Sequence, residues 1–349
     1  MTEHLAARSG VNLRVLGSRR EYAELIPNVG EPWTSYSYAL FDTNTSWQQK
    51  IWYLLRSPCA EEYWSEVDLV YCTAESYVPT HQARTAVTVH DAAAFERNGL
   101  AHPNTWKQRF KWLLLYRRLK STTDLFHTVS EFSAERIAHF FPEIRDRLCV
   151  VYNAVAPHFF EPTAETGREY LSDEGLKDRP FILLPRGLHY RKGADVILEA
   201  WPQIQEVYPE LLLVVTSHND PQYLREARKL RNVRIEGFVS DTALHALYGA
   251  AALVWMPSRY EGFGLPVLES MARGTPVVAS NISALPEVAG DAALLVPPTN
   301  IGQHVAAVDA LLHDRTLRES LEQAGEDRAR KFTWERAADE LYDNFQQLI

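Results

Sequence analysis

Two glutamates, eight positions apart, are the first candidates for chemistry in this sequence. Glu261 lies in the loop string Tyr-Glu-Gly-Phe-Gly, and Glu269 lies in the apolar stretch that follows it. Eight residues of helix rise about 12 Å, and ionised carboxylates accept hydrogen bonds from paired hydroxyls with good geometry. Distances of that order separate the sugar from the ribose of a nucleotide sugar. Either glutamate alone is typical of a solvated surface side chain, whereas the pair in this setting favours function.

The segment around these glutamates predicts a strand, a glycine turn and a helix. Residues 251–256 are apolar and short, as in a buried strand. Gly262 and Gly264 flank Phe263, so the backbone is able to turn sharply and approach a ligand. The backbone N–H groups of a helix that starts near Leu265 would attract an anion such as phosphate. The segment therefore predicts a ligand-binding turn.

Charged side chains follow two other predicted strands. Arg186 comes directly after one strand, and Lys192 precedes the next helix. Two cations in this position suit a diphosphate, although single surface cations are common. His90 and Asp91 end another strand, and ligands of open α/β sheets lie at the carboxyl ends of strands. A lone histidine is usually structural; its position here favours function, and Asp91 is expected to orient the loop.

Composition excludes several classes of protein. The formal net charge of −9 argues against nucleic-acid binding. No apolar run approaches the length of a membrane span, and the first residues lack the apolar segment of a signal peptide. Cys59, Cys72 and Cys149 are scattered without metal-site spacing, so they are interpreted as buried thiols of a cytoplasmic protein.

Alternating strand and helix patterns predict two doubly wound α/β domains. The predicted strands are 11–16, 68–72, 86–91, 124–130, 148–153, 181–185, 211–216, 233–240, 251–256, 277–280 and 292–297. The predicted helices are 2–9, 46–55 (capped by Thr45 or Ser46), 106–120, one opened by Ser130 or Ser133, 194–201, 241–248, one begun by Pro266, a short turn or helix at 285–288, helices within 303–331, and 334–349. Residues 20–66 are expected to be irregular, and residues 161–179 to be a linker or the edge of a domain. The expected domains are 1–155 and 156–333, with helix 334–349 crossing back to the first.

The predicted helix 106–120 interleaves basic and apolar side chains. A helix packed on the sheet with a solvated basic face explains this pattern. Contact with anionic lipid or a lipid-diphosphate acceptor explains it as well. The two interpretations are compatible.

The string from Glu261 to Glu269 resembles the E-x7-E signature of family 4 glycosyltransferases, which are retaining enzymes of the GT-B fold. His90-Asp91 and the string Val-Ser-Glu-Phe-Ser at 129–133 resemble the same family, and the resemblance covers nearly the whole chain. It implies two Rossmann-like domains facing a central cleft. Family members normally open with a strand and a glycine-rich loop before the first helix. Since neither is found here, we expect the natural start to lie upstream or the chain to be truncated.

The resemblance also implies residue roles. Glu261 and His90 would contact the donor sugar, Glu269 the ribose, and Arg186 and Lys192 the diphosphate; Arg191 is the neighbour not chosen. Backbone groups around the remaining expected donor-binding residues would meet the base or phosphates: Gly237, Phe238, Val239, Gly262, Phe263, Gly264 and Leu265. No cofactor and no metal are expected. The expected mechanism is front-face displacement, in which the leaving phosphate helps to deprotonate the acceptor.

The predicted function is retaining transfer of a sugar, with mannose as the best guess, from a nucleotide diphosphate sugar to a glycan or lipid-linked acceptor. The donor would be GDP-mannose if the sugar is mannose, and the protein would be cytoplasmic with peripheral contact to the inner face of the membrane. The first alternative is a sugar-nucleotide epimerase or phosphorylase of the same fold. The second is a truncated, non-catalytic nucleotide-sugar binder.

Overall fold

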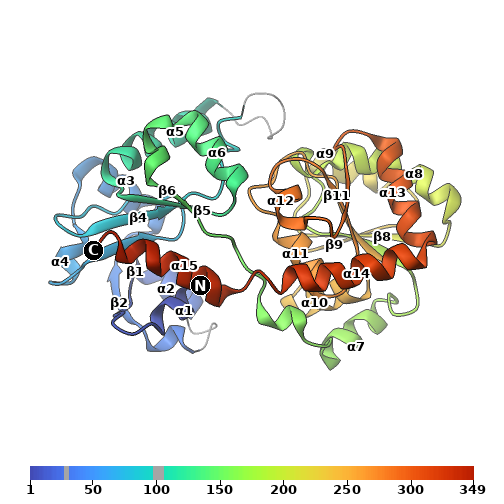
Figure 1. Ribbon diagram of the computed structural model, residues 1–349, viewed down its shortest axis with the longest axis horizontal. Helices are drawn as coiled ribbons and strands as arrows, with labels where there is room; N and C mark the ends of the chain where they lie inside the picture. The colour runs from blue at the N-terminus through green and yellow to red at the C-terminus, as the bar shows by residue number, and fades with distance from the viewer. Residues whose placement is uncertain (27–30, 97–105) are drawn as a thin grey trace.

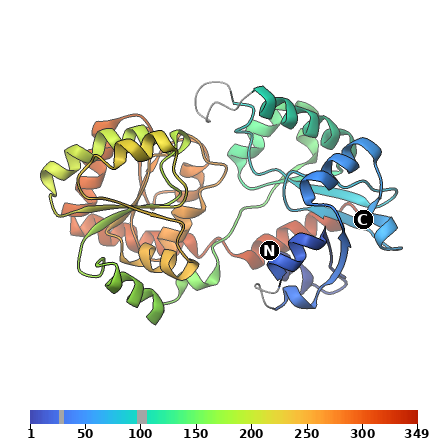
Figure 2. The ribbon, with the colours of Figure 1, turned by 180° about the vertical axis from the view of Figure 1, so that it is seen from behind.

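The chain forms two lobes that lie side by side, each built around a parallel sheet (Figures 1 and 2). The structure, a computed structural model, describes residues 1–26, 31–96 and 106–349, the last range without the side chains of 106–108. The first lobe contains the N-terminal part of the chain and the final helix, and the second contains the strands and helices between them.

The first lobe has two separate parallel sheets, one of four strands in the order β3-β4-β5-β6 and one of the pair β1-β2. Its strands are β1 Arg14–Ser18, β2 Ser37–Phe41, β3 Leu69–Cys72, β4 Arg84–Thr88, β5 Leu125–Thr128 and β6 Leu148–Val150. Its helices are α1 Thr2–Ala6, α2 Arg19–Leu25, α3 Thr45–Leu55, α4 Ala60–Tyr63, α5 Trp106–Thr122 and α6 Glu131–Phe140.

The second lobe has one sheet of six parallel strands in the order β12-β11-β10-β7-β8-β9. Its strands are β7 Phe181–Leu184, β8 Leu212–Thr216, β9 Val233–Gly237, β10 Leu253–Met256, β11 Val277–Ser280 and β12 Leu294–Val296. Its helices are α7 Glu165–Asp173, α8 Ala194–Val207, α9 Pro221–Ala227, α10 Asp241–Ala250, α11 Leu265–Ala272, α12 Leu285–Ala289, α13 Ile301–His313 and α14 Arg315–Ala329.

This strand order is that of a doubly wound nucleotide-binding sheet. β7, β8, β10 and β11 are buried along their whole length, which explains why they are continuous apolar runs. Chain order reverses between the neighbours β7 and β10. Ligands of such sheets bind outside the carboxyl ends of the strands at this reversal. The loops that follow β7 and β10 are therefore where a ligand is expected.

The last helix, α15 (Trp334–Gln346), lies along the first lobe beside α1 (Figure 1). Its apolar face, including Ala337, Leu341 and Phe345, packs in one cluster with Leu5 and Ala86 of the first lobe. The apolar positions three to four residues apart form a single stripe, which is buried here. The end of the chain thereby ties the second lobe to the first.

Four sequence-based expectations about the fold are wrong. The cap of α3 is Asn44, whose side chain accepts from the N–H of Trp47, because the helix starts one residue earlier than expected. The region 20–66 contains regular elements, since β2 pairs with β1 along its whole length. β1 itself begins at Arg14, where this pairing starts, rather than at residue 11. Of the two expectations for 161–179, the linker is wrong, because the segment contains α7, which packs against the apolar core at the edge of the second lobe.

The cysteines differ in burial. Cys59 and Cys72 are buried free thiols, as expected, whereas Cys149 is only partly buried. The expectation of a fully buried Cys149 is wrong because β6 is the last strand of its sheet and is paired on one side only.

Candidate active site

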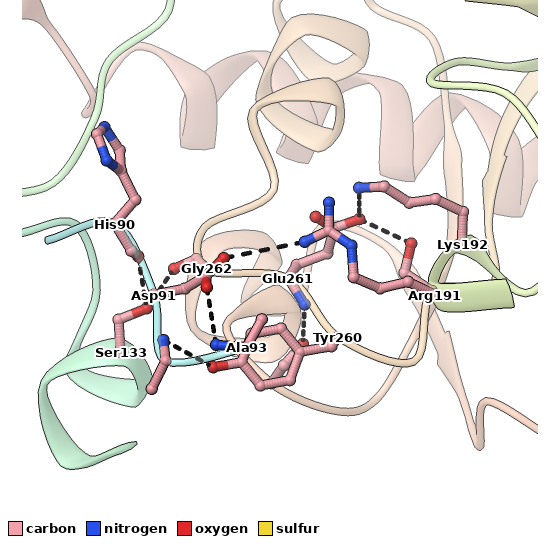
Figure 3. A network of polar contacts seen from close by, with 12 residues as sticks. His90, Asp91, Ala93, Ser133, Arg191, Lys192, Tyr260, Glu261 and Gly262 are labelled. Atoms are coloured by element: carbon pink, nitrogen blue, oxygen red, sulfur yellow. Dashed lines mark hydrogen bonds and ion pairs between the residues drawn. The ribbon is translucent and has the colours of Figure 1, made fainter. Parts of the chain in front are cut away.

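Glu261 lies at the point where the order of strands reverses, in the loop after β10. Its side chain is 6% exposed and accepts hydrogen bonds from Lys192 Nζ at 2.5 Å and from Ser258 Oγ at 2.7 Å. Burial alone would raise the pKa of Glu261, but the charges of Lys192 and Arg191 hold this pKa below its usual range. The site therefore keeps an ionised carboxylate out of water (Figure 3).

Lys192 is directed to Glu261 by close packing of the two loops at the reversal. Gly193 has a φ of 75°, and a Cβ built there would lie 2.1 Å from the carbonyl oxygen of Pro257. Arg259 is nearly buried; its guanidinium pairs with Asp195 and lies over the ring of Tyr190. The loop that carries Lys192 is thus fixed to the loop that carries Glu261.

Arg186 and Glu269 are close enough for the charge of Arg186 to act on the Glu269 carboxylate. Arg186, directly after β7, is a non-glycine residue with φ of 75°, a conformation that costs about 1–2 kcal/mol and is found at functional sites. Glu269 on α11 accepts a hydrogen bond from the hydroxyl of Tyr248 at 2.7 Å. Burial raises the pKa of Glu269, while the Tyr248 hydroxyl and the charge of Arg186 oppose that shift. Glu269 is thus held by a neutral partner rather than by an ion pair.

The two lobes meet at Gly262. A Cβ built on this glycine would lie 2.7 Å from the carbonyl oxygen of His90, so only glycine allows this approach. Ala92 N–H also donates to the Tyr260 hydroxyl, and Arg191 lies 3.9 Å from Asp91. The carboxyl ends of the two sheets therefore face each other.

His90 and Asp91 have different surroundings. His90 N–H donates to Glu75 at 2.8 Å, and its Nδ1 lies 3.5 Å from the other oxygen of that carboxylate. The hydrogen bond to Glu75 raises the pKa of His90. The imidazole is about half exposed and points away from Glu261, so the main chain of His90 is what contacts Gly262 (Figure 3). Asp91 accepts from the N–H of Ala93 at 2.8 Å, as expected of a residue that orients a loop.

The expected base-binding residues lie at the end of β9, on the same edge of the sheet. Phe238 is 82% exposed, and the N–H of Ser217 bonds to the carbonyl of Gly237. Val239 is partly buried against the main core. They do not contact Glu261, since β9 is two strands away from β7. This separation agrees with an extended ligand that lies along the edge of the sheet.

The remaining residues of the glycine turn have mixed roles. Phe263 is 5% exposed and packs on Tyr152 and Phe332, so its side chain belongs to the core and only its backbone faces the site. Gly264 caps α11 with φ of 108°, and Leu265 begins that helix. The turn thus directs the first N–H groups of α11 toward the site, where they favour an anion.

Among the residues around the site that sequence reasoning missed are Ser258, Tyr248, Glu75 and Glu287, whose carboxylate accepts from the first N–H groups of α6. Ser258 lies only three positions before Glu261, and such proximity is a signal that could have found it. The other three reach the site from distant elements, and no local pattern marks them. Of the two neighbouring cations, Lys192 makes the ion pair with Glu261, whereas Arg191 lies 3.9 Å from Asp91.

The group of potential metal ligands and the cavity described below both lie away from Glu261. Within the part of the chain that the structure describes, Cys59, Glu62 and His81 form the one group of potential metal ligands, with ligand atoms within 4.8 Å of one another. This group belongs to α4 and the segment before β4, not to the residues around Glu261. A cavity of about 660 Å³ lies between α8 and α9 and is lined by none of the expected donor-binding residues. The hydrogen bonds and strand order, rather than this cavity, define the candidate site.

Comparisons with known proteins agree with this geometry. The structure is similar to a glycosyltransferase of Rickettsia africae, with a TM-score of 0.67 and 17% identity, covering 92% of this chain and 88% of the other. It is also similar to Anabaena HepE in complex with UDP and glucose, with a TM-score of 0.63 and 15% identity, covering 80% and 77%. These likenesses show a GT-B fold, as expected from the sequence.

Sequence comparisons define the family. The family description "Glycosyl transferases group 1" matches residues 168–328. The chain is 30% identical over 288 residues to the O-antigen chain mannosyltransferase B of Escherichia coli, covering 80% of this chain and 75% of the relative. The chain belongs to the group 1 glycosyltransferases and is a glycosyltransferase, as the resemblance implied. It spans only 28% to 57% of the length of three further curated relatives.

Proposed function

We propose that this protein transfers a sugar, with retention of configuration, from a nucleotide diphosphate sugar to a glycan hydroxyl. The observation that carries the proposal is the buried carboxylate of Glu261, which is ion-paired with Lys192 where the order of strands reverses. A charged group in a site that excludes water interacts strongly with the charge that develops in a transition state.

The residues of the second lobe have the chemistry that a nucleotide sugar needs. Lys192, Arg186 and the first N–H groups of α11 would neutralise the diphosphate and stabilise it as it leaves. Glu269 would accept hydrogen bonds from the ribose hydroxyls, and Glu261 from hydroxyls of the sugar. The backbone at Gly237, Phe238 and Val239 would contact the base.

The mechanism that suits these residues is front-face displacement. Asp91, a carboxylate of the first lobe that is close enough to interact electrostatically with Glu261, is turned to the backbone of Ala93 and to Arg191. Glu261 itself is engaged by Lys192 and Ser258. Neither carboxylate is free to act as a nucleophile in this arrangement. The leaving phosphate would instead help to take the proton of the acceptor hydroxyl, without a metal ion.

Mannose is the proposed sugar and GDP-mannose the proposed donor, because a relative at 30% identity is described as an O-antigen chain mannosyltransferase. The decisive experiment screens nucleotide sugars by thermal shift, since a ligand that binds only the native state raises its stability. The best donor is then offered with candidate acceptors, and the anomeric configuration of the product is determined by NMR. An inverted product, or a donor altered without any acceptor, would refute retaining transfer; the latter result would favour the epimerase or phosphorylase alternative.

A lipid-linked acceptor fits the outer surface of the first lobe. No helix in the described ranges is long and apolar enough to cross a membrane. Phe110 and Leu113 of α5 are 56% and 51% exposed, and Leu54 of the adjoining α3 is 75% exposed. α5 contains basic and no acidic residues, so its surface suits anionic lipid.

Vesicle flotation tests this surface. The protein should float with vesicles that contain phosphatidylglycerol but not with pure phosphatidylcholine vesicles, and Phe110→Ser with Leu113→Ser should abolish flotation. The replacement Val207→Ser, at another exposed apolar residue on α8, is the matched control. Equal flotation of all three proteins would contradict the membrane contact.

A further inference from the structure

The N-terminus of α6 is capped across the boundary between the lobes. Inside its own lobe, Ser130 Oγ accepts from the N–H of Ser133 at 3.0 Å. The preceding N–H groups, of Glu131 and Phe132, donate to the carboxylate of Glu287 at 2.7 and 3.2 Å. The first N–H groups of a helix have no partner within the helix and favour a negative charge. α6 therefore obtains part of its cap from α12 of the other lobe.

The two serines also hold the backbone of the candidate site. Ser130 Oγ donates to the carbonyl of Gly262 at 2.6 Å. Ser133 Oγ lies 3.0 Å from the carbonyls of both His90 and Gly262. A hydroxyl has one proton to donate, so Ser133 donates to the carbonyl of His90 or of Gly262, which lie at the same distance. Both serines are fully buried, which makes the loss of either bond costly.

Glu287 is connected to Glu261 through its own lobe. Arg328 donates to the backbone carbonyls of Glu287 and Val288 at 2.7 and 3.0 Å, which fixes the helix that carries the carboxylate. Just before that helix, Ser283 Oγ accepts from the N–H of Glu261 at 3.0 Å. A change in the contact between Glu287 and α6 would therefore move the loop of Glu261 relative to His90.

We propose that Glu287, Ser130 and Ser133 form an interlobe clasp, and that Glu287 is a positioning residue that sets Glu261 against the loop of His90 when the lobes are closed. The clasp rests on the proposed function in one respect, because the geometry that it sets is that of the transfer reaction. The clasp contacts neither Lys192 nor Glu269. Donor binding to the second lobe should therefore survive its loss, whereas turnover should not.

The kinetic test separates turnover from donor binding. Glu287→Ala should lower kcat about 10-fold, the size expected for a lost helix cap, while the Kd for GDP or UDP measured by calorimetry stays within about 2-fold of wild type. Glu287→Gln should recover part of kcat, because an amide oxygen still accepts from backbone N–H groups. The matched control is Glu319→Ala, which removes a carboxylate paired only on the surface of α14. An unchanged kcat in Glu287→Ala, or a parallel loss of nucleotide affinity, would overturn the proposal.

Small-angle scattering tests the clasp without activity. Glu287→Ala combined with Ser130→Ala should give a larger radius of gyration than wild type, because fewer bonds hold the lobes together. Circular dichroism confirms that both proteins are folded. Identical scattering would refute the clasp even if the enzyme is active. A wild-type protein that transfers no sugar would refute the proposed function, while a difference in scattering would still support the clasp.

Discussion

The surroundings of Glu261 and Glu269 differ although the two residues belong to one turn and helix. Glu261 faces the other lobe and pairs with Lys192, which holds its pKa low despite burial. Glu269 lies within the second lobe beside the neutral hydroxyl of Tyr248, and burial raises its pKa. A carboxylate fixed in an ion pair suits a site where charge develops. A carboxylate with a neutral hydrogen-bonding partner suits the recognition of neutral hydroxyls. The sequence spacing of the two glutamates brings them into one turn and helix. The residues that pair with each carboxylate then give the two glutamates different roles.

Removing the charge of Glu261 should have the largest effect. Glu261→Gln keeps the shape of the side chain but leaves Lys192 buried without its counter-ion. We expect kcat to fall about 10³-fold, the upper range for one preorganised electrostatic group. Steady-state kinetics with the identified donor measure this, and a thermal melt shows that the protein is folded. Glu340→Gln, at a surface ion pair of α15, should behave as wild type. A loss of kcat below about 10-fold would mean that Glu261 contributes no more to the reaction than Glu269.

Lys192→Ala should rank second, with a loss of turnover of about 10²-fold through the missing diphosphate contact. It also leaves Glu261 buried without its nearest cation, so the pKa of Glu261 should rise. In wild type this pKa is depressed, and the stability it contributes is lost only as pH falls below the usual glutamate range. In the variant, the charged form of Glu261 is buried without a counter-ion and is therefore unfavourable. The free energy of unfolding should thus fall as pH rises through and above that range.

Denaturant unfolding at several pH values checks the sign of this effect. Lys229→Ala removes a surface lysine that pairs with Glu226 and should not alter the pH dependence. If Lys192→Ala and wild type have parallel pH profiles, the ion pair does not hold the charge of Glu261.

The same comparison explains what the sequence could predict of the site. Glu261, Gly262 and Glu269 belong to one local unit, in which glycine conformation and helix spacing are readable from the sequence. Tyr248 and Glu287 come from other helices. Their contacts depend on how α10 and α12 pack, which no local pattern specifies. The spacing of residues therefore identified the carboxylates but not the groups that distinguish them.

The fold shows a similar division. Strands β7, β8, β10 and β11 of the second lobe are buried along their whole length and were predicted from continuous apolar runs. In the first lobe, β2 has no fully buried run, since only Phe41 at its end is buried. Its pairing with β1, rather than its composition, makes it a strand. The sequence of α7 is typical of a linker or a domain edge because most of the helix surface is polar, and only Gly167 and Leu171 are buried.

Glu269→Ala should affect donor binding more than turnover. A charge-assisted hydrogen bond contributes about 1.5–3 kcal/mol, so the loss of the contact with the ribose should weaken donor affinity about 10- to 100-fold. Calorimetry with the nucleoside diphosphate measures this directly, and the melting temperature shows whether folding is harmed. Unchanged nucleotide affinity would remove the assignment of Glu269 to the ribose.

Tyr248→Phe should have the smallest effect and sharpens the comparison most. The hydroxyl of Tyr248 opposes the rise that burial causes in the pKa of Glu269, so its removal should raise this pKa further. The proposed contact with the ribose needs an ionised Glu269; affinity is therefore present above this pKa and lost as pH falls through it. In the variant, the loss of donor affinity should begin at a higher pH. At neutral pH, the affinity for the donor should be only about 3-fold weaker than that of wild type.

The matched control is Tyr208→Phe, which removes a tyrosine hydroxyl that donates to Asp309 at 2.7 Å, near the other end of α8 from the loop of Lys192. Its pH profile for nucleotide binding should equal that of wild type. If Tyr248→Phe also matches wild type across the pH range, Glu269 does not rely on a neutral partner. The contrast with Glu261 would then rest on the ion pair of Glu261 with Lys192, since burial alone acts to raise the pKa of both glutamates.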